Sequence, residues 1–108
     1  MPANERILEV YHAGRLTVVG FGNHEVLDRI NVADCRDEMA GLIREHGCEL
    51  LAIDLTGVKL IPSGLLGLLA SLRKLNTEVH VYNPSEDICE VLEITKLDRV
   101  LPVHTIDV

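Results

Sequence analysis

The stretch LAIDLTGVKLIPSGLLGLLASLRK, residues 51–74, decides the fold of this chain. It continues a nearly unbroken apolar run, Leu50 to Leu55, whose length suits a strand buried on both faces of a parallel sheet. Thr56-Gly57 then makes a tight connection, and a helix is predicted from about Ser63 to Leu75. A strand that leads into such a helix indicates an α/β sheet with right-handed crossovers. The core face of the helix consists of leucines at helical spacing: Leu65, Leu68, Leu69, Leu72 and Leu75.

The residues before this stretch predict a hairpin and then a helix. Two runs rich in β-formers, Ile7 to His12 and Arg15 to Gly20, are separated only by Ala13-Gly14, which is the spacing of a β-hairpin. Residues 21–30 have mixed character and receive no assignment. The next helix is predicted to start after Asn31 as its cap and to end at Gly47. Its apolar positions form one stripe: Val32, Cys35, Met39, Leu42 and Ile43.

The residues after this stretch predict a strand, a short helix and a last strand. Asn76 is expected to end the preceding helix in a left-handed conformation, and the strand Glu78 to Tyr82 follows. In Asn83-Pro84-Ser85-Glu86, Asn83 is the predicted helix cap, Pro84 the first helical residue and Glu86 the partner in a capping box. The short helix turns three apolar residues inward: Ile88, Val91 and Leu92.

The last strand candidate lies within Arg99 to Ile106, where Pro102 favours an edge or a bulge. The element order is therefore ββαβαβαβ. This order predicts an α/β fold with a mostly parallel sheet of about five strands, an amino-terminal hairpin, and helices packed against the sheet.

Length and composition describe a single domain, residues 1–108. With 47% hydrophobic residues, the chain is long enough for one core and too short for two. Its 17 acidic and 10 basic residues give a formal net charge of −7, which argues against a nucleic-acid or anionic-membrane surface and favours a protein partner or a small ligand. No leader-like segment or long apolar run is seen, so a cytoplasmic protein without direct membrane insertion is expected.

No constellation of residues predicts an enzyme, a cofactor or a metal site. Cys35, Cys48 and Cys89 are odd in number and lack C-x-x-C spacing, so they are expected to be reduced thiols, and the five histidines are scattered. Asp54 and Lys59 flank the connection before the second helix, but the G-x-S-x-G elbow and a phosphate-binding glycine loop are missing.

Residues 51–74 also resemble the signature of STAS domains, a family named for sulfate transporters and anti-sigma factor antagonists. The family pattern is a strand, Asp-Leu-Ser-Gly-Val, two apolar residues, Asp-Ser-Ser-Gly-Leu-Gly and a Leu-rich helix. VHVYNPSEDICEVLEITKLDRVL, residues 79–101, is similar to the family's fourth strand and third helix. The resemblance implies a STAS-like fold, and it implies that Ser63 takes the position of the serine that a partner kinase phosphorylates. Pro62 stands in place of the signature Asp, and Gly64 in place of the second Ser.

Two residues of this stretch stand out as site candidates. Ser63 has two compatible interpretations: an ordinary helix cap, and a regulatory phosphorylation site, since a helix amino terminus stabilises a phosphate. Leu66 lies off the leucine stripe at about 100° per residue, so it is either an edge core residue or an apolar contact beside Ser63. A shifted role for Asn23 or Glu25, in place of the acidic residue that usually follows the family's second strand, is left open. The candidate partner-binding residues are Lys59, Pro62, Ser63, Gly64, Leu66 and Arg73.

The resemblance implies an anti-sigma factor antagonist, a partner-switching regulator of transcription. In this hypothesis the unmodified protein captures an anti-sigma factor or a histidine-kinase-like serine kinase, and phosphorylation releases that partner. The alternative is a non-switching STAS subunit of a transport or signalling complex, which the departures at Pro62 and Gly64 keep open. A weak homo-oligomer is also left open.

Overall fold

The computed structural model describes residues 8–22 and 24–106, and within these ranges five strands form one sheet in the order β1-β2-β3-β4-β5. β1 pairs antiparallel with β2, and every later pair is parallel. The mostly parallel α/β sheet with an amino-terminal hairpin is thus confirmed. The strands are β1 Glu9–His12, β2 Leu16–Gly20, β3 Leu50–Asp54, β4 Glu78–Tyr82 and β5 Val103–His104. The helices are α1 Val32–His46, α2 Ser63–Ser71 and α3 Glu86–Ile94, with 3-10 segments η1 Leu72–Leu75 and η2 Leu97–Arg99.

Local sequence signals fix the ends of the first two helices. The Asn31 side chain accepts a hydrogen bond from the Asp34 backbone N–H at 3.0 Å, and Gly47 ends α1 with a left-handed φ of 58°. Asn76 is left-handed too, with φ 60°, as predicted. The helix expected to run to Leu75 tightens after α2 into the 3-10 turn η1.

The predicted start of the third helix is wrong by two residues. Ser85 is the cap of α3, and its hydroxyl accepts from the Ile88 N–H at 3.2 Å. Asn83 instead has a left-handed φ of 54°, and its side chain bonds to two distant segments. Because Asn83 turns the chain before the helix begins, Pro84 lies outside α3 and not at its first position.

The last strand is shorter than predicted. Of residues 99–106, only Val103–His104 pair with β4, because η2 occupies Leu97–Arg99 and Pro102 has no N–H for the ladder. His80 alternates with the buried Val79 and Val81, so it faces away from α1 and α2. Its Nδ1 lies 2.9 Å from His104 Nε2, and this contact ties the short strand to β4. The first predicted strand residue, Ile7, lies outside the described residues.

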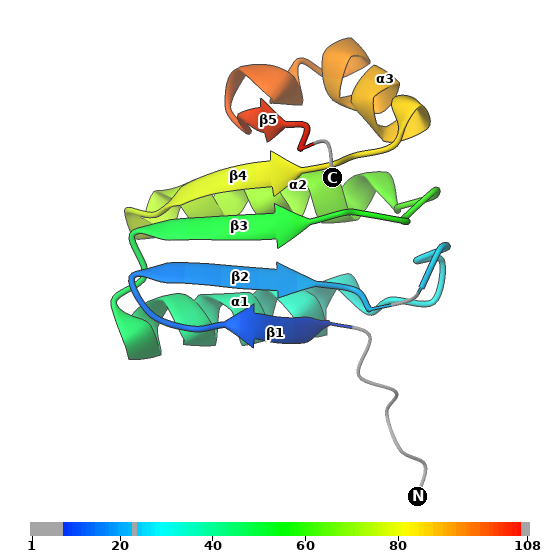
Figure 1. The fold of residues 1–108 in the computed structure, drawn as a ribbon. Coiled ribbons are helices and arrows are strands. Elements are labelled where there is room, and N and C mark those ends of the chain that lie inside the picture. The colour runs from blue at the N-terminus through cyan, green and yellow to red at the C-terminus, as the bar shows by residue number, and fades with distance from the viewer. Residues whose placement is uncertain (1–7, 23, 107–108) are drawn as a thin grey trace, which may run out of the picture.

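The core lies between the sheet and the two helices behind it (Figure 1). Side chains alternate along each strand, and the rows Thr17–Leu51–Val79 and Val19–Ile53–Val81 all point to this side and are buried. Both connections behind the sheet bring the chain back to the same edge, so the loops before α1 and before α2 lie together at the carboxyl ends of the parallel strands. In the described part of the chain, no helix has the length and apolar character needed to cross a membrane.

Candidate functional site

The loop between β3 and α2 starts with a fixed turn. The Thr56 backbone N–H and hydroxyl both donate to Asp54 Oδ1, at 3.0 and 2.6 Å. Gly57 takes the positive φ of 82° that the turn needs, and the Val58 N–H donates to the Leu55 carbonyl at 3.0 Å. The Asp54 carboxylate therefore stabilises the turn by accepting both hydrogen bonds, and it is not paired with a second group among the described residues for acid–base chemistry.

A second loop, residues 24–27, is bound to this one. The Lys59 and Leu60 N–H groups donate to the Glu25 carbonyl at 2.7 and 3.2 Å, and Val26 and Leu60 form an isolated parallel bridge. The Lys59 Nζ also lies 3.7 Å from the Glu25 carboxylate, with both side chains exposed. Residues 24–27 belong to the segment that received no assignment from the sequence, and the structure shows them hydrogen-bonded to the loop before α2. Asn23 lies outside the described residues.

Ser63 stands at the first position of α2 and is exposed. Pro62 is the capping residue, so the interpretation of Ser63 as the helix cap is wrong. The Ser63 hydroxyl makes no hydrogen bond to any described residue. Gly64 beside it is also exposed, and a Cβ added there would meet nothing within 4 Å. The start of α2 is therefore open to a partner or to a modifying enzyme.

Leu66 is buried, with 0% of its surface exposed, so its interpretation as an exposed apolar contact is wrong. At about 100° per residue, Leu66 lies on the flank of α2 opposite Leu68 and Ser71, which face α1. Because α2 is also in contact with η2, segments other than α1 and the sheet help to cover it. The core arc of α2 is therefore wider than one leucine stripe.

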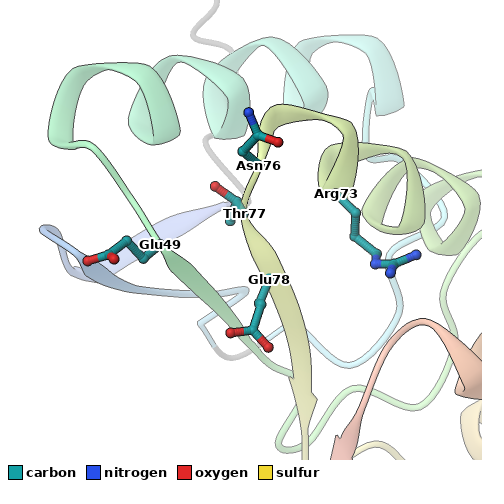
Figure 2. Close-up of a pocket in the computed structure, with 5 residues that line it drawn as sticks. All are labelled: Glu49, Arg73, Asn76, Thr77 and Glu78. Atoms are coloured by element: carbon teal, nitrogen blue, oxygen red, sulfur yellow. The ribbon is translucent and has the colours of Figure 1, made fainter.

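Arg73 does not belong to the same site as Ser63. It follows Ser63 by ten residues along α2 and η1, which at about 1.5 Å per residue separates the two by about 15 Å. Figure 2 shows Arg73 beside a shallow hollow of about 380 Å³ at the opposite edge of the sheet. The other residues that line this hollow are Glu49, Asn76, Thr77 and Glu78.

The exposed apolar residues near Ser63 are Leu60 and Val26 instead. Leu60 is 56% exposed and Val26 is 43% exposed, and their bridge holds them side by side. Sequence reasoning missed them because Val58, Leu60 and Ile61 are all aliphatic, while only the fold shows that Val58 is buried and Leu60 is not. We call Val26, Leu60, Ser63 and Gly64 the carboxyl-edge surface.

Asn83 ties the carboxyl-edge surface to the end of the described chain. Its amide donates to the Thr56 hydroxyl at 3.0 Å, and its side-chain oxygen accepts from the Ile106 N–H at 2.7 Å. The Asn83 backbone N–H also donates to the His104 carbonyl at 2.7 Å. Asn83 thus links the loop before α2 to the last strand through hydrogen bonds.

Among the described residues, the pKa is shifted at two thiols. Burial, with Glu38 and Asp34 nearby, raises the pKa of the Cys35 thiol to about 11, and burial also raises the pKa of Cys89. Raised values keep both thiols protonated and unreactive near neutral pH. In the part of the chain that the structure describes, no three His, Cys, Asp or Glu side chains come close enough to hold a metal ion.

The family follows from a comparison of the sequence with family models, in which the model of the STAS domain matches residues 8–106. The chain belongs to the STAS domain family.

Solved STAS structures share the fold of this chain. An anti-sigma-factor antagonist (STAS) domain protein from Planctomyces limnophilus is 21% identical, with 93% of this chain and 91% of that chain covered and a TM-score of 0.74. The unphosphorylated anti-sigma factor antagonist SpoIIAA is 16% identical, with 89% and 86% covered and a TM-score of 0.73. Phosphorylated SpoIIAA from Bacillus is 16% identical, with 89% of each chain covered and a TM-score of 0.64. A comparison with curated proteins gave no match.

Proposed function

We propose that this protein is a cytoplasmic anti-sigma factor antagonist, a binding module without enzymatic activity that captures an anti-sigma factor or a histidine-kinase-like serine kinase. The observation that carries the proposal is the Ser63 hydroxyl, exposed at the first position of α2 and without a hydrogen-bond partner among the described residues. Two of the similar solved structures are named as anti-sigma factor antagonists, and a third is of SpoIIAA in a phosphorylated form.

Phosphorylation of Ser63 would act on the carboxyl-edge surface through charge. A phosphate adds about −1.5 to −2 charges, which the open amino terminus of α2 stabilises. In the complex the same phosphate would lie next to Leu60 and Val26, where loss of water makes an unpaired charge unfavourable. Phosphorylation therefore weakens capture of the partner without unfolding the domain.

The test compares Ser63→Ala and Ser63→Asp in a binding titration with the cognate kinase. Ser63 is not a cap, so both variants should stay within about 0.5 kcal/mol of the original stability. Ala should keep full binding, and Asp should weaken it by roughly tenfold, since it carries charge into the apolar contact. Ala13→Asp is the matched control and should bind normally, because the turn between β1 and β2 lies at the amino ends of the parallel strands, opposite the loop before α2 (Figure 1). Equal binding by the two Ser63 variants would contradict the switch.

A second candidate function is a non-switching STAS subunit of a transport or signalling complex. Pro62 favours it, because the residue before Ser63 lacks the carboxylate that the family signature places there. Mass spectrometry after incubation with the cognate kinase and ATP separates the two. Phosphate on Ser63 supports the antagonist, and an unmodified Ser63 in a complex that still forms supports the structural subunit.

A further inference from the structure

A groove runs between α1 and α2 on the outer side of the helix layer, away from the sheet. It consists of two adjoining hollows of about 490 and 560 Å³ that share Arg36 and Ser71 as lining residues. The first hollow reaches Val32 at the start of α1, and the second reaches Leu75 at the end of η1. The groove therefore follows the two helices along most of their length.

The groove is basic in an acidic protein. Arg36, Arg44 and Lys74 line it, three of the chain's 10 basic residues, although the formal net charge is −7. Asp37 is the one acidic side chain among the described lining residues, and it lies 3.6 Å from Arg36. Arg44 and Lys74 make no ion pair with any described residue. The groove thus offers two positive charges to an outside ligand.

The shape of the groove suits a helix. Gly41 and Gly67 line it from helix positions, where glycine is about 0.5–1 kcal/mol less stable than alanine. A Cβ added to either would meet nothing within 4 Å, so no contact inside the chain requires these glycines. With Ser71 they leave a shallow floor on which another backbone can approach closely.

We propose that the α1–α2 groove docks an acidic amphipathic helix of a partner protein, independently of Ser63. Carboxylates on the flanks of that helix pair with Arg44 and Lys74, and its small residues pack over Gly41 and Gly67. The protein then has two binding surfaces: the carboxyl-edge surface at the start of α2, and this groove along its outer face.

The experiment titrates the labelled protein with a stapled alanine-based helix carrying glutamate at every fourth position, followed by NMR. Shifts are expected at the backbone amides of Gly41, Gly67 and Ser71, and a lysine version of the peptide should cause none. Arg44→Glu with Lys74→Glu should weaken binding by roughly fivefold, as expected for two exposed ion pairs.

Arg15→Glu with Arg99→Glu is the matched control. Each pair of changes takes the formal net charge from −7 to −11, since two bases become two acids, but Arg15 and Arg99 lie outside the groove. The control pair should bind the peptide normally, and so should Ser63→Asp, which keeps this proposal separate from the switch. Gly67→Gln, which fills the groove from a position with open space, should abolish binding without lowering the melting temperature.

Several outcomes would overturn the proposal: shifts elsewhere or none, equal shifts with the lysine peptide, or equal loss in the control pair. Shifts at the groove amides that depend on protein concentration in the absence of peptide would identify a second copy of this chain as the occupant, which also contradicts an acidic partner helix.

Discussion

Substitution by Ala should lower the free energy of unfolding strongly at Leu66 and hardly at all at Leu60. Leu66 is 0% exposed and packed on α2, whereas Leu60 is 56% exposed in the loop before it. Truncation of a buried leucine removes its burial and leaves a cavity, so Leu66→Ala should lower the free energy of unfolding by about 2–5 kcal/mol. For a domain of this size, that lowers the melting temperature by at least about 8 °C. Leu60→Ala should change the free energy of unfolding by less than about 0.5 kcal/mol.

Urea unfolding followed by circular dichroism measures both free energies, and a titration with the proposed anti-sigma partner measures binding. Leu60→Ala should bind more weakly while it stays folded, because it removes apolar area from the carboxyl-edge surface. Ile94→Ala is the control, since Ile94 is 72% exposed but belongs to α3. An unchanged urea midpoint for Leu66→Ala would refute the reasoning from burial. Full binding by Leu60→Ala would show that the partner does not use this surface.

Two further predictions concern backbone and thiol chemistry. Gly41→Ala should raise the free energy of unfolding by roughly 0.5–1 kcal/mol, because Gly41 lies inside a helix with open space around it. Gly57→Ala should lower the free energy of unfolding by about 1 kcal/mol, because φ is positive at Gly57. A higher urea midpoint for Gly57→Ala than for Gly41→Ala would contradict this argument. Cys35 should resist alkylation at pH 8 in the folded protein, because burial raises its pKa to about 11. Since this folded pKa exceeds the ordinary value of 9.0, the free energy of unfolding should fall as pH rises from 9 to 11. Mass spectrometry that finds Cys35 alkylated as fast as in the urea-unfolded chain would exclude this.

The elements that the sequence predicted well depend on neighbouring residues. Asn31 and Gly47 end α1 through bonds within the helix and its flanks, and the alternation of Val79 and Val81 follows from one strand packed on one face. These features need no knowledge of distant segments. Ser63, by contrast, became a site candidate only through the resemblance to the family signature, because a serine beside Pro and Gly is by itself only a helix-start signal.

Asn83 and Leu66 have roles that depend on segments far away in the chain. Asn83 has the residue type and the spacing of a helix cap, but its side chain bonds to Thr56 and Ile106, and Ser85 caps α3 instead. Leu66 lies off the leucine stripe and is nevertheless buried, and α2 is in contact with η2, whose position nothing in the sequence of α2 indicates.

The apolar part of the carboxyl-edge surface depends on such a contact as well. Leu60 follows β3 and Val26 follows β2, and they become neighbours only because parallel strands place both loops at one edge of the sheet. The Glu25 carbonyl then holds the Lys59 and Leu60 N–H groups, which fixes the loop before α2 without any contact to Ser63 itself. In the proposed switch, a charge added to Ser63 would act on what this surface can bind and would not require the domain to move.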